Sequence, residues 1–514
     1  MSTETPIKLN VPQQDLQSLS LFAANREAAQ GWADALPVAN SSLVATQLSQ
    51  ALDEINRCAL HPELRFEILA SLQSSLLVAT SNLSRRFLNQ PLVMAEELRR
   101  QAELVGRLFT LSATAFTTVA IETLRERDSI RGVNPARLMC EALLRAMEYS
   151  ARKLALGFQL NQAVDINGWL TLHQLYALAE RQELADIPVP GTDGAVTSIT
   201  ACYLQALMLG CCKPNQLRQA DLAVANQALR AWSDLLTISR GEDSDALFVV
   251  DLDRDQPPLY AALYREGAPA QCRRVNTTAL VAHMQSLLEA SSGQSRAGIP
   301  LDGETRIAPG LLSHMVDALG SMSVRNFARK PVTGPLSVSF GLSAAHYHAA
   351  ANRSFVELLH GTGYIPPAPE RVATNPFFTD GHSANNRSDL WSQANPEEDA
   401  IREVSESEAE EQLAHQVQLD ARTAHAIFEE GPELPEERDY PVYELQMVNA
   451  SPGGYCLEWS EQLPGDVKAG ELVSVQEEPG GQWVIAVIRW ISRLKEQRTL
   501  LGLELLSPTA KPFG

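Results

Sequence analysis

Two short motifs about 120 positions apart contain the side chains best suited to ligand chemistry. Arg325 and Arg329 are four positions apart, and Asn449, Ser451 and Gly454 share one short polar segment. A guanidinium forms bidentate hydrogen bonds to phosphate and stacks on a purine. An asparagine offers both an acceptor and donors to a guanine edge, and a serine hydroxyl can bond a ribose, base or phosphate oxygen. Glycine allows the backbone to turn sharply beside a ligand. The two motifs together predict one binding site for a small anion that carries nucleobases.

The segments around these motifs have the pattern of short β-strands. Residues 336–342 follow the two arginines, and residues 442–448 precede Asn449. Glycine and proline turns separate most of the candidate strands, as expected for antiparallel hairpins. Six strands of this length and spacing predict a small closed antiparallel barrel. The other four candidate strands are 454–459, 471–477, 482–491 and 500–506.

The rest of the chain predicts an α+β multidomain protein. Residues 15–240 place apolar side chains three and four positions apart, which indicates an all-α helical module of about eight helices. A flexible leader, 1–14, precedes the module, and a mixed α/β connecting region, 241–304, follows it. The barrel region is expected at 315–508, interrupted by 361–439. That interruption comprises a loop rich in Pro, Asn and Ser and an acidic helical insert at 397–430.

The motifs and the strands next to them resemble the PilZ domain, a small barrel that is a receptor for the bacterial second messenger cyclic di-GMP. The PilZ signature is RxxxR, a strand, [D/N]xSxxG, a later strand ending near a Trp, and a final LGxxLL strand. The resemblance covers roughly residues 320–508 without the interruption, and the family separates its first two motifs by far fewer residues. The matching positions here are Arg325, Arg329, Asn449, Ser451, Gly454, the segment 487–490 with Trp490, and the segment 501–506.

The resemblance implies a large split-PilZ protein that is a receptor and not an enzyme. It implies cyclic di-GMP as the ligand of the two motifs, and no catalytic residue, metal or other cofactor is expected. Ligand binding would change the arrangement of the barrel and the helical module, and so control a protein partner through the module or the acidic insert. The implied outputs are type IV pilus function, motility or surface attachment.

Charge and composition narrow the functional classes. The net charge is −20, of which −12 lies in residues 396–439, so an extended nucleic-acid surface is not expected. The sequence begins with polar residues, and no apolar run approaches the roughly 20 residues that span a bilayer. The seven cysteines are odd in number and without paired spacing. They indicate reduced thiols and a cytoplasmic protein without a membrane span.

Two other functional classes fit parts of the sequence. A degenerate PilZ barrel that binds proteins and no nucleotide is favoured by the wide spacing of the motifs. A phosphatase of the HAD type is suggested by Asp251 and Asp253 after the apolar run 247–250, because such enzymes begin with an apolar strand and DxD.

Several residues also have a purely structural interpretation. The segment 449–454 is a plain hairpin turn in composition, and Trp490 is expected in the barrel core. His346 and His348 are expected on the surface or in packing. A second RxxxR, at Arg489 and Arg493, shows that the spacing alone is weak evidence.

Overall fold

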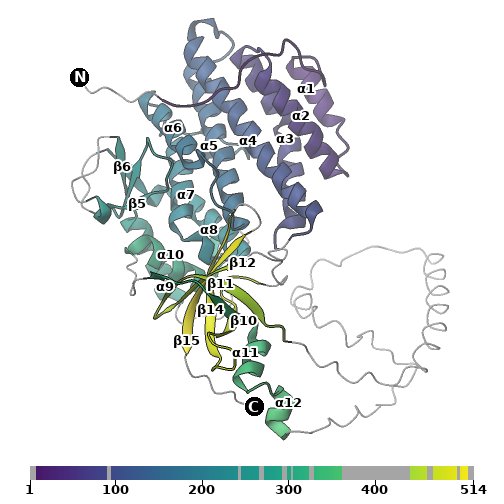
Figure 1. Cartoon of the computed structure of the whole chain (residues 1–514). Coiled ribbons are helices and arrows are strands. Elements are labelled where there is room, and N and C mark those ends of the chain that lie inside the picture. Colours follow the sequence, from purple (N-terminus) through teal and green to yellow (C-terminus); the bar gives the residue numbers. More distant parts are fainter. Residues whose placement is uncertain are drawn as a thin grey trace, which may run out of the picture. The chain divides into compact units, whose positions relative to one another are not determined.

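The computed structural model describes residues 7–89, 94–240, 245–264, 271–291, 298–302, 305–322, 329–361, 440–459, 467–494 and 498–507 (Figure 1). The helical pattern predicted for the first half of the chain is confirmed, with eight α-helices among described residues 7–240. The helices are α1 (Arg26–Asp34), α2 (Ser41–Arg57), α3 (Pro62–Phe87), α4 (Glu96–Arg125), α5 (Pro135–Gln159), α6 (Gly168–Arg181), α7 (Ile199–Cys211) and α8 (Gln219–Ala231).

The two central helices of the module, α4 and α5, illustrate how the sequence sets helix boundaries and packing. Helix α5 begins at Pro135, and the Asn134 side chain accepts hydrogen bonds from the backbone N–H groups of the two residues after that proline. Phe116 of α4 stacks on Tyr149 of α5 with ring centroids 6.0 Å apart. Among the described residues, α4 alone is long and apolar enough to cross a membrane, but 67% of its apolar window is buried inside the protein. That burial is typical of a core helix.

Residues 7–14 lie against the helical module and are not a free leader. The backbone N–H of Lys8 donates to Gln174 Oε1 at 2.7 Å, and the Gln14 side chain donates to the Asn56 carbonyl. Ile7 and Leu9 pack against the core of the module. The predicted loose leader therefore does not extend over these residues.

The connecting region forms a small antiparallel sheet followed by two helices. Its strands are β3 (Thr237–Ser239), β4 (Phe248–Asp251), β5 (Leu259–Tyr260) and β6 (Cys272–Asn276), in the order β3-β6-β4-β5. Helix α9 (Thr278–Ser291) and helix α10 (Pro309–Gly320) flank the hairpin β7 (Ile299–Asp302) and β8 (Thr305–Ile307). The phosphatase hypothesis depends on β4, which has antiparallel neighbours on both sides.

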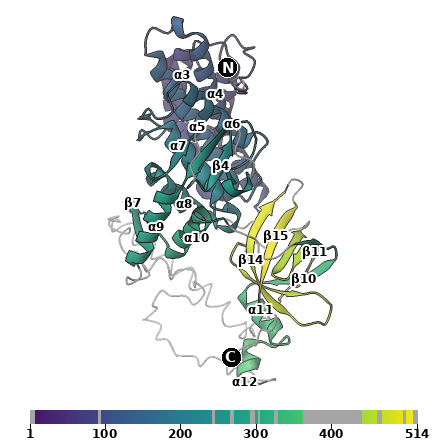
Figure 2. The ribbon, with the colours of Figure 1, turned by 90° about the vertical axis from the view of Figure 1, so that its left-hand side faces the viewer.

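A closed six-stranded antiparallel barrel follows, as predicted (Figure 2). Its strands run in the order β10-β13-β14-β15-β12-β11, and β11 pairs with β10 to close the barrel. Alternate residues face a core that includes Leu336, Leu457 and Ile488, all fully buried. The strands are β10 (Pro335–Phe340), β11 (Tyr443–Ser451), β12 (Gly454–Trp459), β13 (Leu472–Gln476), β14 (Val484–Arg493) and β15 (Thr499–Ser507).

The barrel continues across a long excursion of the chain. Strand β10 leads into α11 (Leu342–Ala349) and then α12 (Phe355–His360), and the chain returns to the barrel at β11. Leu336 and Leu445 are nevertheless direct partners in the ladder. Residues 350–361 and 440–441, the described ends of the excursion, do not belong to the compact unit that holds the barrel. The predicted acidic helical insert lies outside the described residues, as does the preceding loop from residue 362 onward.

Candidate nucleotide-binding site

A seventh, two-residue strand brings the end of the first motif, Arg329, next to the second motif. Strand β9 (Lys330–Pro331) pairs antiparallel with β11, with Pro331 opposite Asn449 and Lys330 opposite Ala450. Arg329 is exposed and lies one residue beyond the second of these pairs. The structure therefore places Arg329 beside the Asn449 motif despite the sequence separation. Arg325 lies outside the described residues.

Asn449 presents an unpaired acceptor next to the charge of Arg329. Its Oδ1 is inaccessible to solvent and has no hydrogen-bond partner among the described residues. Its cross-strand partner is Cys456, whose side chain is buried. Burial raises the pKa of the Cys456 thiol, and the Arg329 guanidinium and the Asn449 amide partly offset that rise. A buried acceptor without a donor costs about 1–3 kcal/mol, so a ligand N–H at this point would be stabilising.

Ser451 and Gly454 close the hairpin between β11 and β12. They are direct partners in the ladder, and the Ser451 hydroxyl donates to the Gly454 carbonyl at 3.3 Å. Gly454 has φ +152°, and a Cβ there would lie 2.0 Å from the Leu503 carbonyl oxygen. Packing of β12 against β15 thus requires this glycine, whatever its role beside a ligand. The ligand roles of both residues stay predictions.

Trp490 lies on the same outer face as Asn449, and its predicted place in the barrel core is wrong. The ladder pairs Asn449 with Cys456, Cys456 with Gly502, and Gly502 with Trp490, and directly opposed residues share a face. Ile488 is in the core, and strict alternation would put Trp490 there too. The register shifts between Ile488 and Trp490, which turns the indole outward.

A glycine opposite a tryptophan is the signal that the sequence reasoning missed. A Cβ on Gly502 would lie 2.0 Å from the Trp490 Nε1, so the indole occupies the space over this glycine. Trp490 is half-buried, which leaves part of its ring available on the outer face. The LG pair of the final strand therefore seats an aromatic ring beside the predicted site.

The charges around this face favour an anion. Glu458 is paired with Arg498 at 3.2 Å, and Glu504 is paired with Arg489. No ion pair to Arg329 occurs within the described part of the chain. The Asn449 Oδ1, which has no partner among the described residues, and the Trp490 ring share one face, and the charge of Arg329 acts on Cys456 of that face. These three groups together suit a purine nucleotide.

The second RxxxR pair lies in a different environment from the first. Arg489 is engaged with Glu504. Arg493 is half-buried at the end of β14, and its backbone N–H donates to the Asn161 carbonyl of the helical module at 2.7 Å. Burial lowers the pKa of Arg493, and Arg99 adds to this effect. These two arginines therefore take part in structural contacts.

The residues considered for phosphatase chemistry also have structural roles. Asp251 is 3% exposed and pairs with Arg254 at 3.2 Å. Asp255 accepts hydrogen bonds from the backbone N–H groups of Asn167, Trp169 and Leu170, at the start of α6. An antiparallel sheet around Asp251 lacks the alternating β/α units that this class of phosphatase uses.

Histidine and cysteine side chains do not form a metal site in the part of the chain that the structure describes. No group of three or more His, Cys, Asp or Glu side chains there could hold a metal ion. His348 is buried on α11 and stacks on Trp483 with centroids 4.3 Å apart, in agreement with its predicted packing role. His346 lies two positions earlier on the same short helix. All seven cysteines are free thiols.

The closed barrel, with Arg329 beside the Asn449 motif, defines a PilZ domain that follows a large helical module. The family description "Cyclic-di-GMP receptor FimW, middle PilZ domain" matches residues 247–512, and the description of the N-terminal domain of the same receptor matches residues 27–244. The Cyclic-di-GMP receptor FimW of Pseudomonas aeruginosa is 32% identical over 524 aligned positions, which cover 100% of this chain and 82% of that protein. The chain belongs to the FimW family of cyclic-di-GMP receptors, which confirms the resemblance to PilZ. No solved structure matches the chain.

Proposed function

We propose that this chain is a non-catalytic cytoplasmic receptor that binds cyclic di-GMP on the outer face of its barrel. The pairing of β9 with β11 carries the proposal, because it brings Arg329 next to the Asn449 motif across the excursion. Membership of a cyclic-di-GMP receptor family supports the choice of ligand. The site needs no metal or other cofactor.

Each predicted residue has a role that its chemistry supports. Arg325 and Arg329 bind the phosphates and stack on a guanine. Asn449 Oδ1 accepts from a guanine N–H, and Ser451 bonds a ribose, base or phosphate oxygen. Gly454 packs closely on β15, which holds the backbone of the β11–β12 hairpin in place next to the ligand. Each charge-assisted hydrogen bond contributes about 1.5–3 kcal/mol net, which suits micromolar or tighter affinity after ordering costs.

Trp490 adds an aromatic surface that the sequence motif alone did not assign to the ligand. Its ring lies over Gly502, which faces Cys456, the cross-strand partner of Asn449. A purine stacked on this ring gains about 1–3 kcal/mol by analogy with nucleic-acid stacking on aromatic side chains.

Signalling follows from the place of the arginines in the chain. They precede β9, on the segment that joins α10 to the barrel. Binding of these arginines to a ligand changes the arrangement of the barrel and the helical module. A ligand shifts such an equilibrium only by its differential affinity for the two arrangements. The module or the acidic insert then acts on a protein partner, in pilus function, motility or surface attachment.

Calorimetric titration of cyclic di-GMP tests the binding site. We expect wild type to bind and an Arg325→Ala/Arg329→Ala variant to lose at least tenfold in affinity, about 1.4 kcal/mol. An Arg107→Ala/Arg137→Ala variant is the matched control, since both side chains are exposed on the helical module. It should bind as wild type does.

The scaffold alternative predicts a different result. Ser451 and Gly454 have structural roles in the hairpin, so the motif would persist in a barrel that binds no nucleotide. Absence of binding by folded wild type would favour that scaffold. Equal binding by wild type and the Arg325→Ala/Arg329→Ala variant would place the ligand elsewhere.

A further inference from the structure

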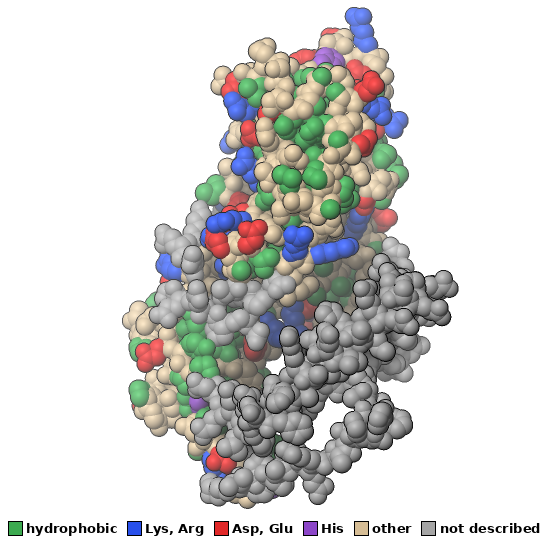
Figure 3. Space-filling model, turned by 90° about the vertical axis from the view of Figure 1, so that its right-hand side faces the viewer, with side chains coloured by type: hydrophobic (Ala, Val, Ile, Leu, Met, Phe, Trp, Pro, Cys, Tyr) green, Lys and Arg blue, Asp and Glu red, His purple; other side chains and the backbone are tan. Residues whose placement is uncertain are grey.

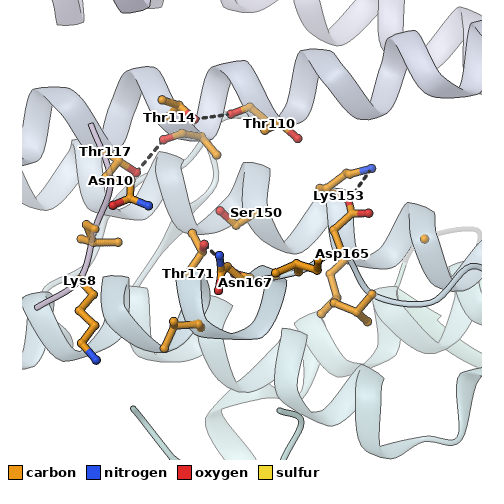
Figure 4. A pocket seen from close by; sticks show the side chains of 18 of the residues that line it. Lys8, Asn10, Thr110, Thr114, Thr117, Ser150, Lys153, Asp165, Asn167 and Thr171 are labelled. Atoms are coloured by element: carbon orange, nitrogen blue, oxygen red, sulfur yellow. Dashed lines mark hydrogen bonds and ion pairs between the residues drawn. The ribbon is translucent and has the colours of Figure 1, made fainter. Parts of the chain in front are cut away.

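A cavity of about 590 Å³ lies within the helical module, far along the chain from the barrel motifs (Figure 4). Residues 8–10 form one side of it, and α4, α5 and residues 162–171 form the others. Cavities of about 300–1,000 Å³ are typical of small-molecule sites. Its lining contains two lysines, one aspartate, several hydroxyl groups and an apolar wall, and these groups restrict the ligands that would fit.

Three charged side chains line the cavity, and two of them, Lys153 and Asp165, form an ion pair. Lys153 Nζ lies 3.2 Å from the Asp165 carboxylate, and the Asp165 side chain is 70% exposed. A solvent-accessible pair of this kind contributes little to stability, so a ligand can separate it at low cost. Gly106 of α4 leaves room for the ammonium group, because a Cβ there would lie 2.9 Å from Lys153 Nζ.

The nearby start of helix α6 does not supply a second anion site. The Asp255 carboxylate already accepts from three backbone N–H groups at that helix start, at 2.6, 3.0 and 3.1 Å. A ligand anion in the cavity therefore has Lys153 as its partner. Lys8 also lines the cavity, and its side chain points away from Lys153 and Asp165 (Figure 4).

The hydroxyl groups of the cavity present acceptors. Thr110, Thr114 and Thr117 of α4 each donate to the carbonyl four residues earlier, at 3.1, 2.9 and 2.7 Å. Ser150 of α5 donates in the same way at 2.8 Å. Their hydrogen atoms are committed to the helix backbone, and only oxygen lone pairs remain for a ligand. This wall requires a ligand with N–H or O–H donors.

The apolar part of the lining includes Leu154, Val164 and Leu170. Gly157 of α5 also lines the cavity, and a Cβ there would meet no atom within 4 Å. The open volume therefore extends to the backbone of α5. An apolar group of a ligand can occupy this part of the cavity.

We propose that this cavity binds a small amphipathic α-amino acid. Its carboxylate pairs with Lys153, and its ammonium group donates to the released Asp165 and to the hydroxyl oxygens. Its apolar side chain fills the space along Leu154 and Gly157. Lys153 and Asp165 offer one charge of each sign in the same cavity, as a zwitterion requires, and this observation carries the proposal.

Calorimetric titration of L-leucine into the full-length chain at low salt tests the proposal. We expect saturable binding by wild type. Two analogues should bind at least tenfold more weakly: 4-methylpentanoate, which lacks the ammonium group, and 3-methylbutylamine, which lacks the carboxylate. No binding of L-leucine by folded wild type, or equal binding of all three compounds, would overturn the proposal.

Two variants locate the site. Lys153→Met removes the cation, and Gly157→Leu fills the cavity; both should abolish binding of L-leucine. Gly31→Leu in α1 is the matched control, because a Cβ at Gly31 also meets nothing within 4 Å and Gly31 does not line the cavity. Cyclic di-GMP plays no part in these titrations. Retention of binding by folded Gly157→Leu protein would refute the assignment.

Discussion

Among the predicted site residues that the structure describes, Asn449 is the one whose side chain indicates a role in binding and not in folding. Its Oδ1 is buried without a donor among the described residues, whereas the hydroxyl of Ser451 and the backbone of Gly454 are already used within the hairpin. A group with an unused hydrogen-bonding atom contributes less to folding than to a ligand that satisfies it. Asn449 is therefore the residue at which affinity and stability are most easily told apart.

We expect Asn449→Ala to weaken cyclic di-GMP binding about tenfold while changing the free energy of unfolding by less than about 1 kcal/mol. Titration calorimetry and urea unfolding measure the two quantities. Gln446→Ala, an exposed position on the same strand, is the control and should change neither. Large destabilisation by Asn449→Ala would show that the side chain is structural.

His173 shows how burial alone can make stability depend on pH. The ring is fully buried, with Nε2 donating to the Gln256 carbonyl at 2.9 Å and Nδ1 accepting from the Tyr203 hydroxyl at 2.6 Å. Burial lowers the pKa of His173 from 6.5 to about 4. The neutral ring is favoured in the folded state, so its contribution is present above pH 6.5 and is lost as the pH falls toward 4.

The expected loss from His173 is about 3 kcal/mol between pH 6.5 and pH 4. Urea unfolding of wild type and a His173→Gln variant at several pH values measures it. Carboxylates titrate in both proteins, so the difference between the two curves isolates the histidine. Parallel curves would contradict the assignment.

At the scale of elements, the β11–β12 hairpin is positioned by close contact with β15. Gly454 packs on the Leu503 carbonyl, and the backbone N–H of Leu505 donates to the Gly453 carbonyl at 3.0 Å. These contacts hold the hairpin, and with it Asn449 and Ser451 on β11, against β15. The position of Asn449 and Ser451 thus depends on the contact between Gly454 and the Leu503 carbonyl, in which neither residue takes part.

Gly454→Ala should destabilise the protein by about 3 kcal/mol, because the new Cβ meets the Leu503 carbonyl in addition to the strain of positive φ. Gly480→Ala is the matched control, since Gly480 has φ +76° and a Cβ added there would meet no atom within 4 Å. It should cost only about 1 kcal/mol, the strain alone. Thermal or urea unfolding compares the two variants, and equal losses would mean that strain dominates over the contact.

At the scale of the whole molecule, the barrel closes without the residues that interrupt it in sequence. Four consecutive pairs join β10 to β11, from Pro335–Gln446 to Val338–Tyr443. On the face of the described residues that Figure 3 shows, acidic and basic side chains are interspersed with hydrophobic ones. Most of the net negative charge instead belongs to residues 396–439.

Replacement of residues 362–439 by a flexible Gly-Ser linker should leave cyclic di-GMP affinity within about twofold of wild type, because the β10–β11 ladder closes the barrel from residues outside this segment and the predicted site residues also lie outside it. Titration calorimetry measures the affinity, and circular dichroism checks the fold. A tenfold gain in affinity would instead indicate that the acidic segment covers the arginines.

The local periodicity of the sequence determined the helical module, the six barrel strands and the hairpin turns. Strand β12 occupies the predicted residues 454–459, because side-chain alternation and flanking glycines act over a few positions. The partnership of Asn449 with Pro331 and the outward turn of Trp490 were decided only by the tertiary structure. Both depend on strand register and on a bulge, which are set by pairing between segments far apart in the chain. Periodicity within one segment contains no information about the register of its partner.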